Sequence, residues 1–229
     1  MGKGSFGEVW RAEGPGGARA ALKIIPLDNP LSIRELRAVR RILRIGHAHL
    51  MPIVGIWLVD HEGQLMDNFL SSADSQRLQE ATPIDDPAQL IEAMPLGDQD
   101  LATRLTECRQ GGSCGIPVDE LLNYLGDVAK AIDYMNAPRH DLGNGPVALH
   151  HGDIKPQNII LVGGTAQLCD FGLARVLGNS QSISTGVAGS VAYLPPEMIR
   201  DKRAHAKSDQ YSLAITYVEL RTGELPFAV

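Results

Sequence analysis

The sequence predicts an α+β fold made of two lobes. Short strand-like segments and one helical stretch occupy the chain before about residue 95, and amphipathic helical segments dominate after it. The two kinds of segment do not alternate, which argues against a parallel sheet built from βαβ units. We therefore expect residues 1–94 to form a small lobe with an antiparallel sheet and one helix, and residues 95–229 to form a mainly helical lobe.

The composition indicates a globular protein. Its 229 residues, 44% of them hydrophobic, suffice for a packed core. A net charge of −6 argues against a nucleic-acid partner, and no apolar run is long enough to cross a membrane. Three cysteines without paired spacing indicate reduced thiols in the cytoplasm. One cluster of basic residues is interpreted as the solvated face of a helix, with a polyanion site as the alternative: Arg34, Arg37, Arg40, Arg41 and Arg44.

The first lobe is expected to open with a hairpin. Residues 6–12 and 19–25 are strand-like and flank a glycine-rich turn at 14–17. A helix should follow, because Ser32 and Glu35 have the spacing of a capping box and apolar residues then repeat with helical period to about residue 45.

Two further strands complete the expected sheet. Residues 53–60 and 89–93 are apolar and strand-like. The polar stretch between them, residues 65–87, is interpreted as an insertion or a long loop.

The second lobe is expected to centre on a helix over residues 121–135, whose apolar side chains form one stripe after the candidate cap Asp119. Strand-like pieces at 159–162 and 167–169 flank a Gly-Gly turn and predict a small hairpin. A last helix should span about residues 208–221.

Two short motifs carry the strongest chemical signal. Residues 151–158 read HGDIKPQN, and residues 170–172 read DFG. Together they place two acids, a lysine and an asparagine on loops next to the predicted hairpin. Such a set can hold a divalent metal ion and position a hydroxyl nucleophile beside a triphosphate.

A glycine-rich motif opens the chain. Residues 2–9 fit G-x-G-x-x-G-x-V, in which backbone amides can approach phosphate oxygens. A dinucleotide-binding fold would need a helix directly afterwards, whereas a strand is predicted there; a plain glycine turn is the other alternative. Lys23, at the end of the second strand, is placed to touch phosphate or is simply a surface lysine. Glu35 is its candidate ion-pair partner, unless it only closes the capping box.

Taken in order, these motifs resemble the protein kinase catalytic domain of the eukaryotic-like Ser/Thr class, with a bacterial character. The resemblance implies a bilobal kinase-like fold, ATP and Mg²⁺ as cofactors, and a protein substrate with a serine or threonine hydroxyl. It also implies that Lys23 and Glu35 set the phosphates and that Ile91 is the gatekeeper of the adenine pocket, before a hinge of Glu92, Ala93 and Met94. The residues implied to contact ATP are Gly2, Lys3, Gly4, Gly7, Val9, Ala21, Lys23, Glu92, Met94 and Asp170.

The resemblance also assigns the loop residues. Asp153 is implied to be the catalytic base, and Asn158 with Asp170 to hold Mg²⁺. Lys155 is implied to neutralise the transferred phosphoryl group, and lysine at this position indicates serine/threonine rather than tyrosine chemistry. His151 is interpreted as a scaffold of the loop rather than a base.

Residues 189–197 resemble the end of an activation segment, with Ser190 implied to contact Asp153 and Lys155. Asp209 resembles the acid that anchors the catalytic loop, with a helix cap as the alternative. His150 is interpreted as an ordinary neighbour of the loop.

The sequence departs from the family pattern at Gly152, where most members have an arginine that pairs with a phosphate on the activation loop. We therefore expect basal activity not to depend on the hydroxyls of this loop, at Ser180, Ser182, Ser184 and Thr185. Both ends of the chain look truncated relative to the family, so the helical lobe is expected to be incomplete at its C-terminus. An ATP-binding scaffold without transfer activity, or an inactive fragment, are the alternative functions.

Overall fold

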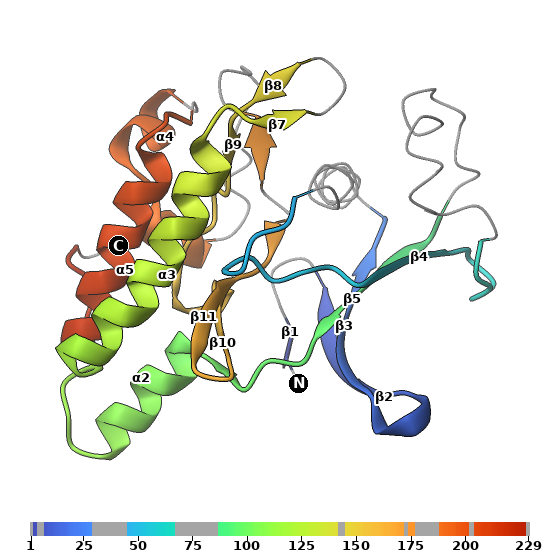
Figure 1. Ribbon diagram of the computed structural model, residues 1–229, viewed down its shortest axis with the longest axis horizontal. Helices are drawn as coiled ribbons and strands as arrows, with labels where there is room; N and C mark the ends of the chain where they lie inside the picture. The colour runs from blue at the N-terminus through green and yellow to red at the C-terminus, as the bar shows by residue number, and fades with distance from the viewer. Residues whose placement is uncertain are drawn as a thin grey trace. The chain divides into compact units, whose positions relative to one another are not determined.

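The computed structural model (Figure 1) groups the chain into two compact units. One comprises Met1–Arg37 and Pro52–Leu96, and the other comprises Ala38–Met51 and Gly97–Val229. Of the described residues in that stretch, His49 and Met51 bond through their backbones to Leu168 of the second unit, at 2.9 Å each. The structure describes residues 2–3, 7–28, 45–66, 87–141, 145–171, 174–176, 188–201 and 204–227.

The first unit contains a five-stranded antiparallel sheet in the order β1-β2-β3-β5-β4 (Figure 1). The predicted hairpin is confirmed: β2 pairs with β3 through a 3₁₀ turn at Pro15–Gly17, where Gly16 and Gly17 have positive φ angles. The strands are β1 (Gly2–Lys3), β2 (Glu8–Glu13), β3 (Arg19–Pro26), β4 (Gly55–Val59) and β5 (Gln89–Pro95).

The two faces of this sheet differ in burial. On β3, Ala21, Lys23 and Ile25 are buried, whereas the alternating Leu22 and Ile24 are half-buried. Successive side chains of a strand point to opposite faces, so Lys23 belongs to the buried face.

The second unit is mainly helical. Its helices are α2 (Leu101–Gln110), α3 (Val118–Asn136), α4 (Pro196–Asp201) and α5 (Ser208–Thr222). Short strands connect them, among which β10 pairs with β11 as the predicted hairpin and also with β6. These strands are β6 (Gln99–Asp100), β7 (His140–Asp141), β8 (Pro146–Val147), β9 (Leu149–His150), β10 (Ile159–Val162), β11 (Thr165–Leu168) and β12 (Arg175–Val176).

Helix α3 forms the centre of this unit and packs against β11 and α5 (Figure 1). Its predicted apolar stripe is confirmed, with Leu121, Val128 and Met135 completely buried. The predicted cap was wrong: Pro117 precedes the helix and Asp119 lies inside its first turn. A carboxylate there interacts favourably with the helix dipole without capping a particular N–H.

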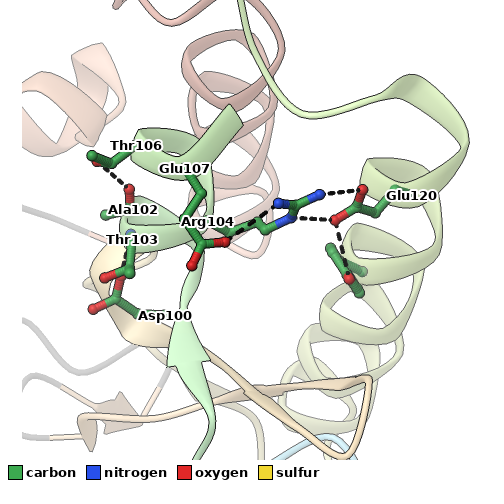
Figure 2. Close-up of polar contacts among 8 residues, drawn as sticks. Asp100, Ala102, Thr103, Arg104, Thr106, Glu107 and Glu120 are labelled. Carbon is green, nitrogen blue, oxygen red and sulfur yellow. Dashed lines mark hydrogen bonds and ion pairs between the residues drawn. The ribbon is translucent and has the colours of Figure 1, made fainter. Parts of the chain in front are cut away.

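Helix α2 was not predicted from the sequence. Only Leu101, Leu105 and Cys108 of its ten residues are buried, so its apolar stripe is short. Asp100 caps it by accepting the N–H of Thr103 at 2.6 Å. Figure 2 shows the guanidinium of Arg104 reaching from α2 to Glu120 on α3, with N···O distances of 2.7 and 3.0 Å. This paired contact lowers the pKa of Glu120 and braces the two helices.

Three predictions lie outside the described residues: the helix over residues 32–45 with Glu35, the arginine cluster, and nearly all of the polar stretch 65–87. Among the residues that the structure describes, no helix combines the length and apolar character needed to cross a membrane.

Candidate active site

The loop between β9 and β10 brings three predicted catalytic residues together. The side chain of Asp153 accepts a hydrogen bond from Lys155 Nζ at 2.7 Å and from Asn158 Nδ2 at 2.8 Å, both at Oδ2. Asn158 Nδ2 also donates to the backbone oxygen of Asp153 at 2.7 Å. Asp153 and Asn158 are buried. The carboxylate is therefore held in one orientation by a cation and an amide.

This loop is anchored from α5, as predicted. Asp209 accepts the backbone N–H of His151 at 2.9 Å and that of Gly152 at 3.0 Å, and its side chain is 1% exposed. Burial alone would raise the pKa of Asp209, but the charge interactions with His150 and His151 and the N–H bond from His151 outweigh it and hold that pKa below its ordinary value.

His150 is more than an ordinary neighbour of the loop. Its Nδ1 lies 2.8 Å from Oδ1 of Asp209, out of line for a hydrogen bond but close enough for a strong charge interaction. Its side chain is 2% exposed. Sequence reasoning missed this role because the two residues are far apart along the chain.

His151 joins the catalytic loop to the DFG segment. Its Nε2 lies 3.1 Å from the backbone oxygen of Cys169, and its Nδ1 lies 3.3 Å from the N–H of Asp153. Only a neutral ring protonated at Nε2 can donate to the first group and accept from the second. Complete burial lowers the pKa of His151, which favours this neutral form. The ring also meets the ring of Phe171 edge-on, so the scaffold role is supported.

Gly152 has a φ angle of 83°. This left-handed conformation is easily adopted by glycine and costs residues with a β-carbon about 1–2 kcal/mol. With glycine at position 152, the chain lacks the arginine side chain of the family pattern. It also avoids the backbone strain that a positive φ angle imposes on a residue with a β-carbon.

Asp170 is the described non-glycine residue with a positive φ, 64°. Such a conformation costs about 1–3 kcal/mol and is typical of functional sites. The N–H of the preceding Cys169 donates to the backbone oxygen of Asn158 at 2.9 Å. This bond ties the segment of Asp170 to the segment of Asn158, the two predicted metal ligands.

The donor atoms of these two residues suit a hard divalent cation. Both amide hydrogens of Asn158 are directed at Asp153, which leaves its Oδ1 as the ligand atom, and Asp170 offers a carboxylate. Within the described ranges, no group of three or more histidine, cysteine or acidic side chains could hold a metal by itself. Mg²⁺ that is bound together with substrate phosphates typically takes only one or two carboxylates from the protein.

In the first unit, five residues predicted to contact ATP share the buried face of the sheet. Val9 and Glu92 lie directly opposite Lys23, and Met94 lies opposite Ala21. Residues directly opposite in an antiparallel pair point to the same face. The sheet thus presents these five side chains together.

The glycine-rich segment is described in part. Gly2 and Lys3 form β1, paired with Val9 and Glu8. A β-carbon on Gly7 would lie 2.1 Å from the backbone oxygen of Ile24, so only glycine fits there. Gly4 and Glu35 lie outside the described residues.

The pairing register corrects one prediction. Ile91 lies opposite Ile24 and Trp57, on the face that does not carry Lys23. It therefore does not line a pocket beside Lys23 as a gatekeeper would. The residue of β5 that faces Lys23 is Glu92.

The end of the activation-segment-like stretch is fixed to α5, a feature that sequence reasoning missed. Tyr193 donates its hydroxyl hydrogen to Glu219 at 2.6 Å, and Ser212 Oγ donates to the backbone oxygen of Tyr193 at 2.8 Å. Burial and the bond to Glu219 raise the pKa of Tyr193, which keeps it a neutral donor. The side chain of Ser190 lies outside the described part of the chain.

Comparisons with known proteins agree with this geometry. The family model described as "Protein kinase domain" matches residues 1–229. The leucine-rich repeat receptor protein kinase MSL1 of Oryza sativa subsp. japonica is 30% identical over 99% of this chain, and the serine/threonine-protein kinase VIK of Arabidopsis thaliana is 27% identical over 100% of it. The serine/threonine-protein kinase PknL of Mycobacterium tuberculosis is 46% identical over 34% of the chain. The matches span 14%, 46% and 20% of these relatives, respectively.

Proposed function

Because the chain belongs to the protein kinase domain family, we propose that it transfers the γ-phosphoryl group of ATP to a serine or threonine hydroxyl of a protein substrate. The observation that carries this proposal is the arrangement of Asp153, whose carboxylate is oriented by Lys155 and Asn158. A carboxylate held in this way can accept the proton of a hydroxyl nucleophile.

The proposed step is an in-line displacement. The substrate oxygen bonds to the γ-phosphorus, its proton passes to Asp153, and the bond to the β-phosphate oxygen breaks to release ADP. Lys155, 2.7 Å from Asp153, supplies positive charge beside the transferred group. Lysine two positions after the base supports a serine or threonine substrate rather than tyrosine.

The remaining residues of the site bind nucleotide and metal in this proposal. Asn158 and Asp170 hold Mg²⁺, which neutralises charge on the phosphates. Lys23, with Glu35, contacts the phosphates, while the glycine segment and the hinge residues Glu92 and Met94 cover the nucleotide. A cytoplasmic location is part of the same proposal, because ATP is available there.

The direct test replaces Asp153 by asparagine and measures phosphate transfer from Mg-ATP to a peptide library containing serine and threonine. Loss of a general base lowers the rate by about 10²–10⁴-fold. Binding of an ATP analogue should stay within about threefold of wild type, because the base does not bind the nucleotide. Asp127→Asn, on a partly exposed aspartate of α3, is the matched control and should retain activity.

Wild-type transfer rates in the Asp153→Asn variant, in a preparation shown free of other kinases, would overturn the mechanism. ATP binding without transfer by the wild-type chain would instead identify an ATP-binding scaffold. A parallel library containing only tyrosine hydroxyls should remain unlabelled.

A further inference from the structure

The attachment of the catalytic loop to α5 does not by itself account for the contact between His150 and Asp209. The backbone N–H groups of His151 and Gly152 already bond to the Asp209 carboxylate, the first to Oδ2 at 2.9 Å and the second to Oδ1 at 3.0 Å. Nδ1 of His150 lies 2.8 Å from the same Oδ1. The imidazole is thus a third group placed against a carboxylate that already holds the loop.

The short distance shows where the imidazole carries its hydrogen. Asp209 has a pKa below its ordinary value, so it is ionised at neutral pH. A bare ring nitrogen 2.8 Å from Oδ1 would direct its lone pair at those of the carboxylate, which is unfavourable, so Nδ1 carries a hydrogen. Nε2, on the far side of the ring, is buried and has no hydrogen-bond partner among the described residues. The polar contact that the structure shows for this ring is therefore made from Nδ1.

The orientation of the Asp209 carboxylate is the property that such a contact can control. The last torsion of an aspartate side chain has a broad energy profile, so the carboxylate turns easily. Turning would move Oδ1 away from the N–H of Gly152, a residue with a freely rotating backbone and no side chain to hold the loop. The Nδ1–H group beside Oδ1 opposes this rotation, because its attraction to the oxygen weakens as the oxygen moves away.

We propose that His150 is a positioning residue that fixes the catalytic base through Asp209. The chain of contacts runs from Nδ1 of His150 to Oδ1 of Asp209, and from Oδ1 to the N–H of Gly152, which adjoins Asp153. The backbone of His150 is held by the pairing of β9 with β12. This inference rests on the proposed function only in taking Asp153 as the base.

The test compares three replacements of His150 in the phosphate-transfer assay. Asparagine can place an amide N–H near the position of Nδ1, glutamine places one near Nε2, and leucine supplies neither. His150→Leu and His150→Gln should lower kcat about tenfold or more, with the KM for ATP within about threefold of wild type. His150→Asn should keep kcat within about threefold of wild type.

His140→Leu is the matched control. It also removes a buried histidine, but the ring of His140 bonds to the backbone oxygen of Tyr134 at 2.8 Å. Any general cost of losing a buried histidine appears in this variant too, and its kcat should stay close to that of wild type.

Amide hydrogen exchange, measured by NMR without nucleotide, separates this inference from the proposed function. His150→Leu should speed exchange of the His151 and Gly152 N–H groups about tenfold or more, whereas His150→Asn should not, and the amides of α3 should exchange as in wild type. If the wild-type chain binds ATP without transferring phosphate, the proposed function fails, and exchange alone decides the role of His150.

Three results would overturn the positioning role. One is wild-type kcat and exchange in all three variants. Another is an asparagine variant as impaired as the leucine variant, since the contact from Nδ1 would then not be the cause. The third is faster exchange with unchanged kcat in a chain that transfers phosphate, which would leave His150 a stabilising residue only. If His150→Leu does not fold, the difference between His150→Asn and His150→Gln gives the same decision.

Discussion

Replacement of Asp209 by alanine should destabilise the protein far more than replacement of a surface aspartate. The carboxylate accepts two backbone N–H groups, from His151 and Gly152, and lies beside His150 in a site closed to solvent. Alanine leaves both N–H groups without their acceptor and removes the carboxylate that lies 2.8 Å from His150 Nδ1. The catalytic loop then loses its attachment to α5.

The size of the effect follows from these contacts. A hydrogen bond to a charged group contributes about 1.5–3 kcal/mol, so the two bonds amount to about 3–6 kcal/mol. Breaking a buried charged interaction by removing one partner costs about 3–5 kcal/mol. The two estimates overlap at about 3–5 kcal/mol, which lowers the melting temperature of a domain of this size by about 6–20 °C. Asp209→Asn keeps one acceptor oxygen and should lose about half as much.

Urea unfolding followed by circular dichroism measures this loss. Asp127→Ala is the control, because Asp127 is 20% exposed and its contact with Lys130 at 3.0 Å is a surface ion pair, where about 1 kcal/mol or less is expected. A loss of stability in Asp209→Ala no greater than that in Asp127→Ala would refute the anchoring role.

Three further predictions follow from the same unit. Gly152→Arg should lower the free energy of unfolding by about 1–2 kcal/mol because of its φ angle of 83°, and unchanged urea midpoints would contradict this. The lowered pKa of His151 means that the unfolded chain binds its proton more readily, so stability should fall as pH drops from about 7 to about 5. His151→Gln should make the urea midpoint less dependent on pH in this range. The control His47→Asn should have a smaller effect, although the pKa of His47 is lowered as well. Arg104→Ala should cost about 1 kcal/mol at low salt and less in about 1 M salt, as thermal melts at both ionic strengths would show.

Much of the site could be predicted from the sequence because its residues lie close together along the chain. Asp153, Lys155 and Asn158 fall within one short loop, and their contacts in the structure agree with their proposed roles. The strands of the β2–β3 hairpin were also predicted, because a glycine-rich turn separates them. Helix α3 was predicted because its apolar residues repeat with helical period over several turns.

What the sequence could not show depends on pairing between distant segments. Leu90, Ile91 and Ala93 surround Glu92 in a nearly continuous apolar run, so alternation does not reveal which residues face inward. A shift of one residue in the pairing exchanges the two faces of a strand. Only the register with β3 shows that Glu92, and not Ile91, lies on the same face as Lys23. The contact of His150 with Asp209 likewise joins residues on different elements, for which no local pattern exists.

One departure from the family pattern bears on how this site is held in its active arrangement. Gly152 lacks the guanidinium that would pair with an activation-loop phosphate. Its N–H is bonded to Asp209, so the catalytic loop is attached to α5 by a contact that requires no phosphate.

Basal activity should therefore survive the loss of loop phosphorylation. Replacing Ser180, Ser182, Ser184 and Thr185, which lie outside the described residues, by alanine should change the rate of phosphate transfer by less than about threefold, because position 152 carries no arginine that could bind a loop phosphate. The same peptide assay measures it, with phosphatase-treated wild-type protein as the comparison. Loss of transfer in the fourfold variant, with an unchanged melting temperature, would show that a hydroxyl or phosphate of this loop orders the site by a route other than residue 152.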